Sequence, residues 1–188
     1  MVGAVLVALM GAVIDVRSAR IPNRLTYSAL LAALVLQAGG PKTERSSDAA
    51  AFARLKKLVG DWEADTRMGK AHLSYELMAG GTALVEKESA EKMPAMLTVY
   101  HLDGQRLLLT HYCMAGNQPR MQARAYNTES GELEFQFLDA TNLANPGAGH
   151  MHSAKFRFVD NDHLATEWEF YENGQQKMTE TAQYTRVR

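Results

Sequence analysis

The sequence contains one cysteine, Cys113, and almost no net charge. A single cysteine excludes an internal disulfide framework, and no Cys-x-x-Cys pair is present for a zinc ribbon or a dithiol redox site. The formal net charge of −1 gives no basic face, so nucleic acid is not an expected partner. No apolar run reaches the ~20 residues that an independent membrane-spanning helix needs. The length of 188 residues suits one ordinary domain with an appendage.

The first forty residues differ in composition from the rest of the chain. Two apolar runs, 1–14 and 27–36, flank a stretch with three arginines. The positive-inside rule places this stretch in the cytoplasm, so the two runs would form a membrane hairpin. A signal peptide with its apolar region at 25–36 is a second interpretation, and a buried helical pair is a third. The first two predict that the remaining chain is periplasmic or secreted, with a possible anchor in the inner membrane.

The polar stretch at 15–26 reads Asp-Val-Arg-Ser-Ala-Arg-Ile-Pro-Asn-Arg-Leu-Thr. It resembles the first catalytic segment of type IV prepilin peptidases, which are membrane aspartic proteases, and the resemblance covers residues 1–38. It implies a catalytic role for Asp15. Such a protease needs two carboxylates that share a proton, and the nearest second candidate, at 58–61, lacks the first glycine of the family's Gly-x-Gly-Asp pattern. We therefore expect a membrane anchor or export signal without peptidase activity.

The rest of the chain predicts a short helix followed by a sheet. Residues 41–58 form a polar linker and a short amphipathic helix, in which Phe52, Leu55 and Leu58 share one face. Ten alternating segments follow between turn residues, and such short strands with short connections predict a mainly β fold, an antiparallel up-and-down barrel over 59–188. The expected strands are 59–67, 70–78, 82–90, 94–102, 105–114, 119–127, 131–139, 149–159, 163–171 and 176–187.

A Gly-Asp-Trp sequence opens the first expected strand, at Gly60 to Trp62. It resembles the Gly-x-Trp signature of lipocalins and other calycins, and the strand pattern is similar to nitrobindin-like barrels and to uncharacterised bacterial lipocalin-like domains. The resemblance covers residues 50–188 and implies a barrel that holds a small, often apolar ligand. It also implies structural roles for Gly60, Trp62 and Arg186, with the arginine packed over the indole ring.

Two histidines on one expected strand are the sharpest candidate for a metal site. His150 and His152 stand at i and i+2, so an undistorted strand points both to one side. His111, Cys113 or Glu180 could supply a third ligand. The alternative is that both histidines line the mouth of the barrel and hydrogen-bond a polar group of a ligand.

Further candidate ligand contacts lie on the central strands and on one turn. Polar side chains on otherwise apolar strands or at a rim could contact a ligand, and an arginine at a rim could bind an acid group. The isolated thiol of Cys113 is expected to be a small buried apolar group, and the Glu86-Lys87-Glu88 sequence is expected on a solvated outer face. The ligand-contact candidates are His111, Tyr112, Asn117, Arg120 and Trp168.

The sequence thus predicts an exported or membrane-tethered lipocalin-like barrel that binds a small, largely apolar molecule without catalysis. A prepilin-type peptidase that uses Asp15 and a metal-dependent site at His150 and His152 are the alternatives. No cofactor other than such a metal ion is expected, and the sequence predicts no oligomeric state.

Overall fold

The structure is a computed structural model and describes residues 48–188. Asp15 and the predicted hairpin or signal segment lie outside these residues. No helix within 48–188 is long and apolar enough to cross a bilayer. The described chain begins with helix α3 (Asp48–Leu55) and the 3-10 turn η1 (Lys56–Leu58) and continues as strands, with a second 3-10 turn, η2 (Ala79–Gly81), between β2 and β3.

Ten strands follow one another as an antiparallel meander, and β1 pairs with β10 to close the barrel. The mainly β, ten-stranded antiparallel barrel with one short helix that the sequence predicted is therefore confirmed. The strands are β1 (Gly60–Thr66), β2 (Gly69–Met78), β3 (Ala83–Ala90), β4 (Met93–Asp103), β5 (Arg106–Tyr112), β6 (Gln118–Asn127), β7 (Glu132–Thr141), β8 (His150–Phe158), β9 (His163–Glu172) and β10 (Gln175–Arg186).

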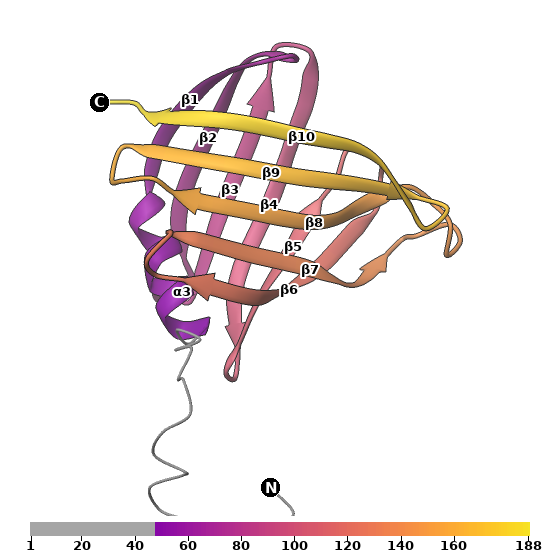
Figure 1. Cartoon of the computed structure of the whole chain (residues 1–188), viewed down its shortest axis with the longest axis horizontal. Helices are drawn as coiled ribbons and strands as arrows, with labels where there is room; N and C mark the ends of the chain where they lie inside the picture. Colours follow the sequence, from indigo (N-terminus) through magenta and orange to yellow (C-terminus); the bar gives the residue numbers. More distant parts are fainter. Residues whose placement is uncertain (1–47) are drawn as a thin grey trace, which may run out of the picture. The chain divides into compact units, whose positions relative to one another are not determined.

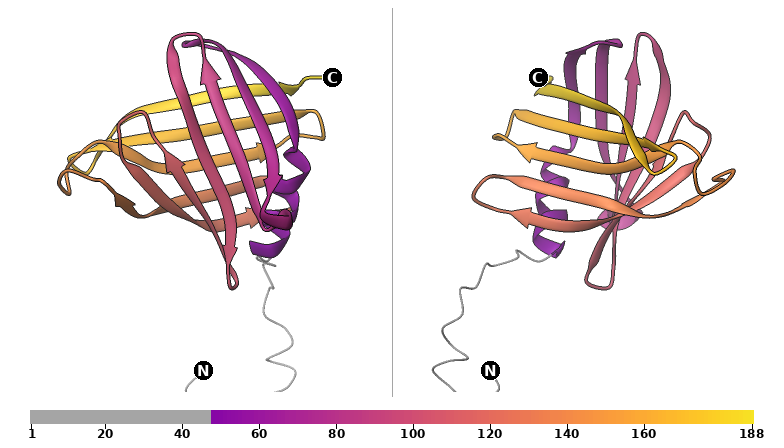
Figure 2. Two further views of the ribbon diagram at one scale, coloured as in Figure 1. Left: turned by 180° about the vertical axis from the view of Figure 1, so that it is seen from behind. Right: turned by 45° about the vertical axis from the view of Figure 1, so that its right-hand side comes forward.

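The barrel consists of two halves whose strands cross steeply. Strands β1 to β5 run across the direction of β6 to β10, as Figures 1 and 2 show. Long ladders join the strands within each half, but the two seams between the halves are short. Strands β5 and β6 pair over Leu108–Thr110, and β1 pairs with β10 only at Trp62 with Arg186 and at Glu63 with Thr185.

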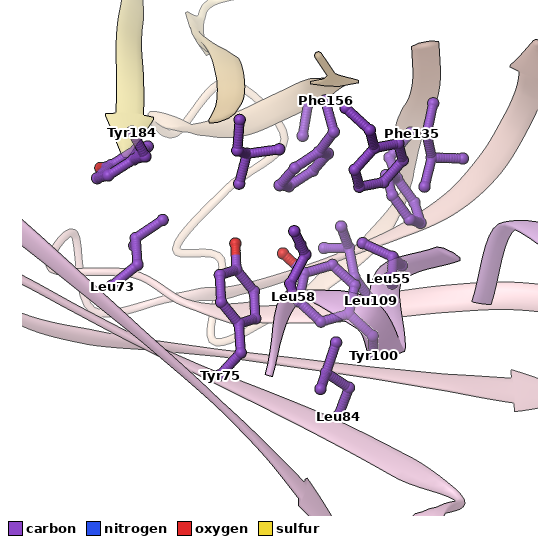
Figure 3. Packing of buried hydrophobic residues seen from close by; sticks show 14 of the residues in the cluster. Leu55, Leu58, Leu73, Tyr75, Leu84, Tyr100, Leu109, Phe135, Phe156 and Tyr184 are labelled. Carbon is purple, nitrogen blue, oxygen red and sulfur yellow. The ribbon is translucent and has the colours of Figure 1, made fainter. Parts of the chain in front are cut away.

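Helix α3 packs against one end of the barrel. Its buried face, Phe52 and Leu55, joins the core that the strands enclose. The Asp48 carboxylate accepts a hydrogen bond of 2.7 Å from the backbone N–H of Leu107, which fixes the start of the helix on β5. This end of the interior is filled with large side chains from both halves, because the sequence supplies an aromatic or leucine at most inward positions there (Figure 3).

The first and last strands are held together at the Trp62 ring. The Trp62 Nε1–H donates to the carbonyl of Leu58 at 2.7 Å, and the Arg186 guanidinium carbon lies 4.2 Å from the ring centroid. Gly60 has a φ of 118°, and a Cβ there would lie 3.1 Å from Arg186 Nη1, so this position requires glycine. The contact that the calycin resemblance implied is present.

Candidate functional site

A small cavity lies inside the barrel at the end away from α3. The volume of the cavity that the centre of a water molecule can occupy is about 20 Å³, so the cavity has room for about one water. The side chains that enclose it come from the ends of β1 to β5 and from β8 to β10, so both halves of the barrel contribute. They are Thr66, Met68, Ala71, Glu88, Ala90, Met93, Met96, His111, Met151, Thr166, Trp168, Glu180, Ala182 and Tyr184.

His111 lies at the base of this cavity and is only 2% exposed. Its Nδ1 and the Thr98 hydroxyl are 3.0 Å apart and share a hydrogen bond. Its Nε2 is buried and has no hydrogen-bond partner among the described residues. Burial lowers the pKa of His111 to about 4, because the interior disfavours the charged imidazolium. At neutral pH the imidazole is therefore uncharged and has one nitrogen available to a ligand.

A carboxyl group that the sequence pattern had assigned to solvent lies behind His111. Glu86 is 2% exposed, and Tyr100 donates a hydrogen bond of 2.7 Å to it. Burial raises the pKa of Glu86, and interactions with Tyr75, Tyr100 and Thr98 partly oppose that rise. Thr98 thus lies between Glu86 and His111 and connects the buried carboxyl to the wall of the cavity.

Two more carboxyl groups, Glu88 and Glu180, line the cavity itself. Tyr184 donates a long hydrogen bond of 3.4 Å to Glu88. Burial raises the pKa of Glu88 to about 8, and the nearby carboxyls of Glu86 and Glu180 add to the rise because like charges repel. The prediction of a solvated outer face for the Glu86-Lys87-Glu88 sequence is therefore wrong for both glutamates.

The remaining wall of the cavity is soft and apolar. Trp168 packs against His111 with ring centroids 5.0 Å apart, and the side chains of Met93, Met96 and Met151 close the other sides. Methionine has a flexible, unbranched side chain that adapts to differently shaped partners. The cavity therefore combines a polar wall of carboxyls and an imidazole with a wall that can rearrange.

A β-bulge determines where the two neighbouring histidines of β8 lie. Met151 pairs with Phe170 and Ser153 pairs with Glu169, so His152 is an extra residue in β8. The bulge breaks the alternation on which the sequence prediction depended. Met151 lines the cavity, and neither His150 nor His152 does.

His150 and His152 instead belong to a cluster of stacked rings. His150 Nε2 and His152 Nδ1 are 3.2 Å apart. The His152 ring stacks between Phe137 and Tyr171, at centroid distances of 5.1 and 4.3 Å. Burial and the adjacent His150 lower the pKa of His152. Within residues 48–188 no three His, Cys, Asp or Glu side chains are grouped so that they could hold a metal ion.

The other predicted contact residues lie outside the cavity. Tyr112 is exposed, and Arg120 forms an ion pair with Asp139 on the adjacent strand. Asn117 is buried and donates 2.8 Å to the carbonyl of Gly149, which ties the β5–β6 turn to the loop before β8. Of the seven predicted contact residues, His111 and Trp168 line the cavity.

Sequence reasoning missed Glu86, Glu88 and the four methionines that line the cavity. A signal for the glutamates was present, since Leu84, Glu86 and Glu88 alternate on one face of β3 and Leu84 is fully buried. The methionines carry no such signal, because methionine fills gaps in any core.

Comparisons with family models and with curated proteins give no match. The chain is similar to the crystal structure of Rv2717c from M. tuberculosis, with 18% identity and a TM-score of 0.50, over 73% of this chain and 98% of that one.

It is also similar to a protein of unknown function from the DUF3598 family of Nostoc punctiforme, with 14% identity and a TM-score of 0.50. That match covers 71% of this chain and 49% of the other, so it spans about half of the larger protein. At these identities the likeness shows the fold alone, a barrel compatible with a lipocalin-like architecture. None of the comparisons supports the resemblance of residues 1–38 to prepilin peptidases.

Proposed function

We propose that this protein is a non-catalytic binding protein that holds one small molecule in the cavity at the end of the barrel away from α3. The observation that carries the proposal is His111. Its Nε2 is buried and has no hydrogen-bond partner within residues 48–188, and His111 lines a cavity that other polar groups also face. A buried polar atom without a partner costs about 1–3 kcal/mol, and a bound ligand would remove that cost.

The composition of the cavity wall favours a small molecule with both a polar and an apolar part. Glu88, Glu180 and His111 supply polar contacts on one side, and Trp168 with the methionines supplies apolar contacts on the other. Ligand sites in proteins generally combine a mainly apolar lining with a few placed polar groups. The cavity has room for about one water, so we expect the methionine side chains to move when a larger ligand enters.

The cysteine and the cavity histidine give little support to catalysis. Burial raises the pKa of the Cys113 thiol, which lies outside the cavity lining, so the thiolate that would act as a nucleophile is disfavoured. The imidazole of His111 lines the cavity and forms a hydrogen bond to Thr98 with its Nδ1. We further propose, from the sequence alone, that the barrel functions outside the cytoplasm and that residues 1–38 direct or tether it there.

The test is native mass spectrometry of the full-length protein together with NMR of its methionine methyl groups. We expect a small molecule to co-purify with the wild type, or one member of a set of neutral, cationic and anionic fragments to shift the methyl signals of Met93, Met96 and Met151. Ala182→Phe fills the cavity and should abolish the effect. Ala95→Phe places the same ring on an exposed position of β4 and should not. A protein that retains nothing and shows no methyl shifts contradicts the proposal.

A further inference from the structure

The described part of the barrel interior collects three acidic groups, Glu86 and Glu88 from β3 and Glu180 from β10. Burial raises the pKa of Glu88, and the nearby carboxyls of Glu86 and Glu180 raise it further. No lysine or arginine occurs among the described residues that line the cavity. Burial of a carboxylate is costly unless a cation or hydrogen-bond donors neutralise it. Among the described residues, the side-chain donor to Glu88 is the Tyr184 hydroxyl.

The orientation of His111 adds a further acceptor to this wall. The Thr98 hydroxyl has one proton, and the neighbouring Glu86 carboxyl is the strongest acceptor near it. We assign that proton to Glu86, so the Thr98 oxygen accepts from the Nδ1–H of His111 at 3.0 Å. In a neutral imidazole the second nitrogen is then a bare acceptor. His111 Nε2 is buried and has no partner in the described part of the chain, so it offers its lone pair to a molecule in the cavity that His111 lines.

From this arrangement we infer that the ligand is a small organic cation, a protonated primary amine with a short apolar substituent, whose ammonium group is bound by Glu88, Glu180 and His111 Nε2. The inference rests on the proposed function and specifies its ligand class. An alkylammonium has three N–H donors and no acceptor, and the lining of the cavity offers three acceptors. They are not grouped closely enough to hold a metal ion, but hydrogen bonds of about 2.7–3.2 Å reach further than metal–ligand bonds of about 2 Å. A carboxylate or phosphate would face like charge at the same place.

The rest of the cavity lining also suits such a ligand. Trp168 lines the cavity, and an indole ring can attract a cation by about 0.5–2 kcal/mol. The ammonium group is similar in size to a water molecule and fits the existing space of about 20 Å³. The alkyl chain would extend between Met93, Met96 and Met151, which are flexible enough to separate.

Binding of a cation should be linked to the ionisation of Glu88. The titratable groups that interact with Glu88 are Glu86 on β3, Tyr100 on β4, Cys113 after β5, and Glu180 and Tyr184 on β10. His111 is neutral at neutral pH. An ammonium ligand binds the ionised carboxylate and releases its proton, so affinity should rise about tenfold per pH unit up to about pH 8 and then level off.

The experiment compares three four-carbon probes on the full-length protein: n-butylammonium, n-butanol and butanoate. Methionine methyl shifts report occupancy, and Trp168 fluorescence provides a second signal. We expect n-butylammonium to bind at least ~10-fold more tightly than n-butanol at pH 8, butanoate not to bind, and only the cation to show the pH dependence. The amine stays protonated over this range, since its pKa is near that of lysine, about 10.4.

Two variants and one control separate the possible results. Glu88→Gln and Glu180→Gln should each weaken n-butylammonium binding by about tenfold or more. Glu88→Gln should also remove the pH dependence of that binding. Glu76→Gln, at an exposed position of β2, should change neither. If n-butanol or butanoate binds as well as the cation, the inference is overturned and the proposed binding function stands. If no probe binds and the purified protein retains no molecule, both fail.

Discussion

The guanidinium of Arg186 lies over the Trp62 ring and donates to three backbone carbonyls, those of Val59, Lys57 and Asn161, at 2.7, 2.8 and 3.0 Å. One side chain near the end of the chain thus connects η1, β1 and the β8–β9 turn. Because β1 and β10 share only a short ladder, this side chain holds the closed barrel together where backbone pairing is sparse.

Arg186→Ala should therefore lower the free energy of unfolding by about 2–3 kcal/mol, because it removes the ring contact and leaves three carbonyls without their donor. Urea denaturation measures this change. Arg186→Lys should recover only part of it, since an ammonium cannot present the planar fork. The matched control is Arg188→Ala, whose side chain is 84% exposed and whose loss should change stability by less than about 0.5 kcal/mol. Equal effects of the two alanine variants would contradict the role of Arg186.

Tyr100→Phe tests the buried hydrogen bond to Glu86. The substitution deletes the hydroxyl that donates at 2.7 Å and leaves a buried carboxyl short of one donor. We expect a loss of about 1–3 kcal/mol in the free energy of unfolding. Tyr112→Phe makes the same chemical change at an exposed position and should be nearly neutral. Thermal or chemical unfolding of both variants gives the comparison, and a neutral Tyr100→Phe would show that the hydrogen bond has no net effect on stability.

Glu88→Gln should change how stability depends on pH. The pKa of Glu88 is 4.5 in its unperturbed state and about 8 in the fold, so the folded protein binds the extra proton between these values. The free energy of unfolding should therefore fall as pH rises from about 4.5 to about 8. The glutamine variant cannot ionise and should lack this fall. Denaturation at several pH values tests this, with Glu76→Gln as control. If the free energy of unfolding depends on pH in the same way for the wild type and for Glu88→Gln, Glu88 is not a buried group that titrates in this range.

His111→Gln should produce the opposite change on the acid side. The pKa of His111 falls from 6.5 to about 4 on folding, so between these values the unfolded chain binds more protons. Wild-type stability should then decrease as pH falls from 6.5 towards 4, and the variant should lose this component. His72→Gln, at a side chain that is 52% exposed, is the control. A wild-type curve that matches His111→Gln over this range would contradict the burial of a neutral imidazole.

The tautomer of His111 can be observed directly. If Thr98 accepts from Nδ1–H, the nitrogen spectrum of the imidazole should show a protonated Nδ1 and a bare Nε2 at neutral pH. Thr98→Val removes the acceptor and should shift this tautomer towards the form with a proton on Nε2. A wild-type spectrum with the proton on Nε2 would contradict the assignment and make His111 a donor to the ligand.

The alternation of apolar and polar residues predicted the ten strands, because period-2 patterns and turn residues depend mainly on local sequence. The helical spacing of Phe52, Leu55 and Leu58 predicted the helix before them, and the Trp62–Arg186 contact was implied by the calycin resemblance. The cavity was less accessible to such reasoning. The bulge at His152 shifts the register without a local sequence mark, so Met151 lies where a histidine was expected. Glu86 and Glu88 follow the inward alternation of β3, but their charge favours a surface assignment. Only the closed barrel shows that Tyr100 and Tyr184 from other strands donate to them.

The unequal seams of the barrel also bear on how a molecule could reach an enclosed space. Strands β1 and β10 separate after two residue pairs. Beyond these pairs, Thr66 at the end of β1 and Glu180 on β10 both border the cavity. A side-chain hydrogen bond of 3.4 Å from Arg67 to the carbonyl of Thr179 spans this interval. Widening this interval breaks few backbone hydrogen bonds, so we expect a ligand to enter the barrel between β1 and β10. Backbone amides that border the interval should therefore exchange with solvent deuterium sooner than those within either half.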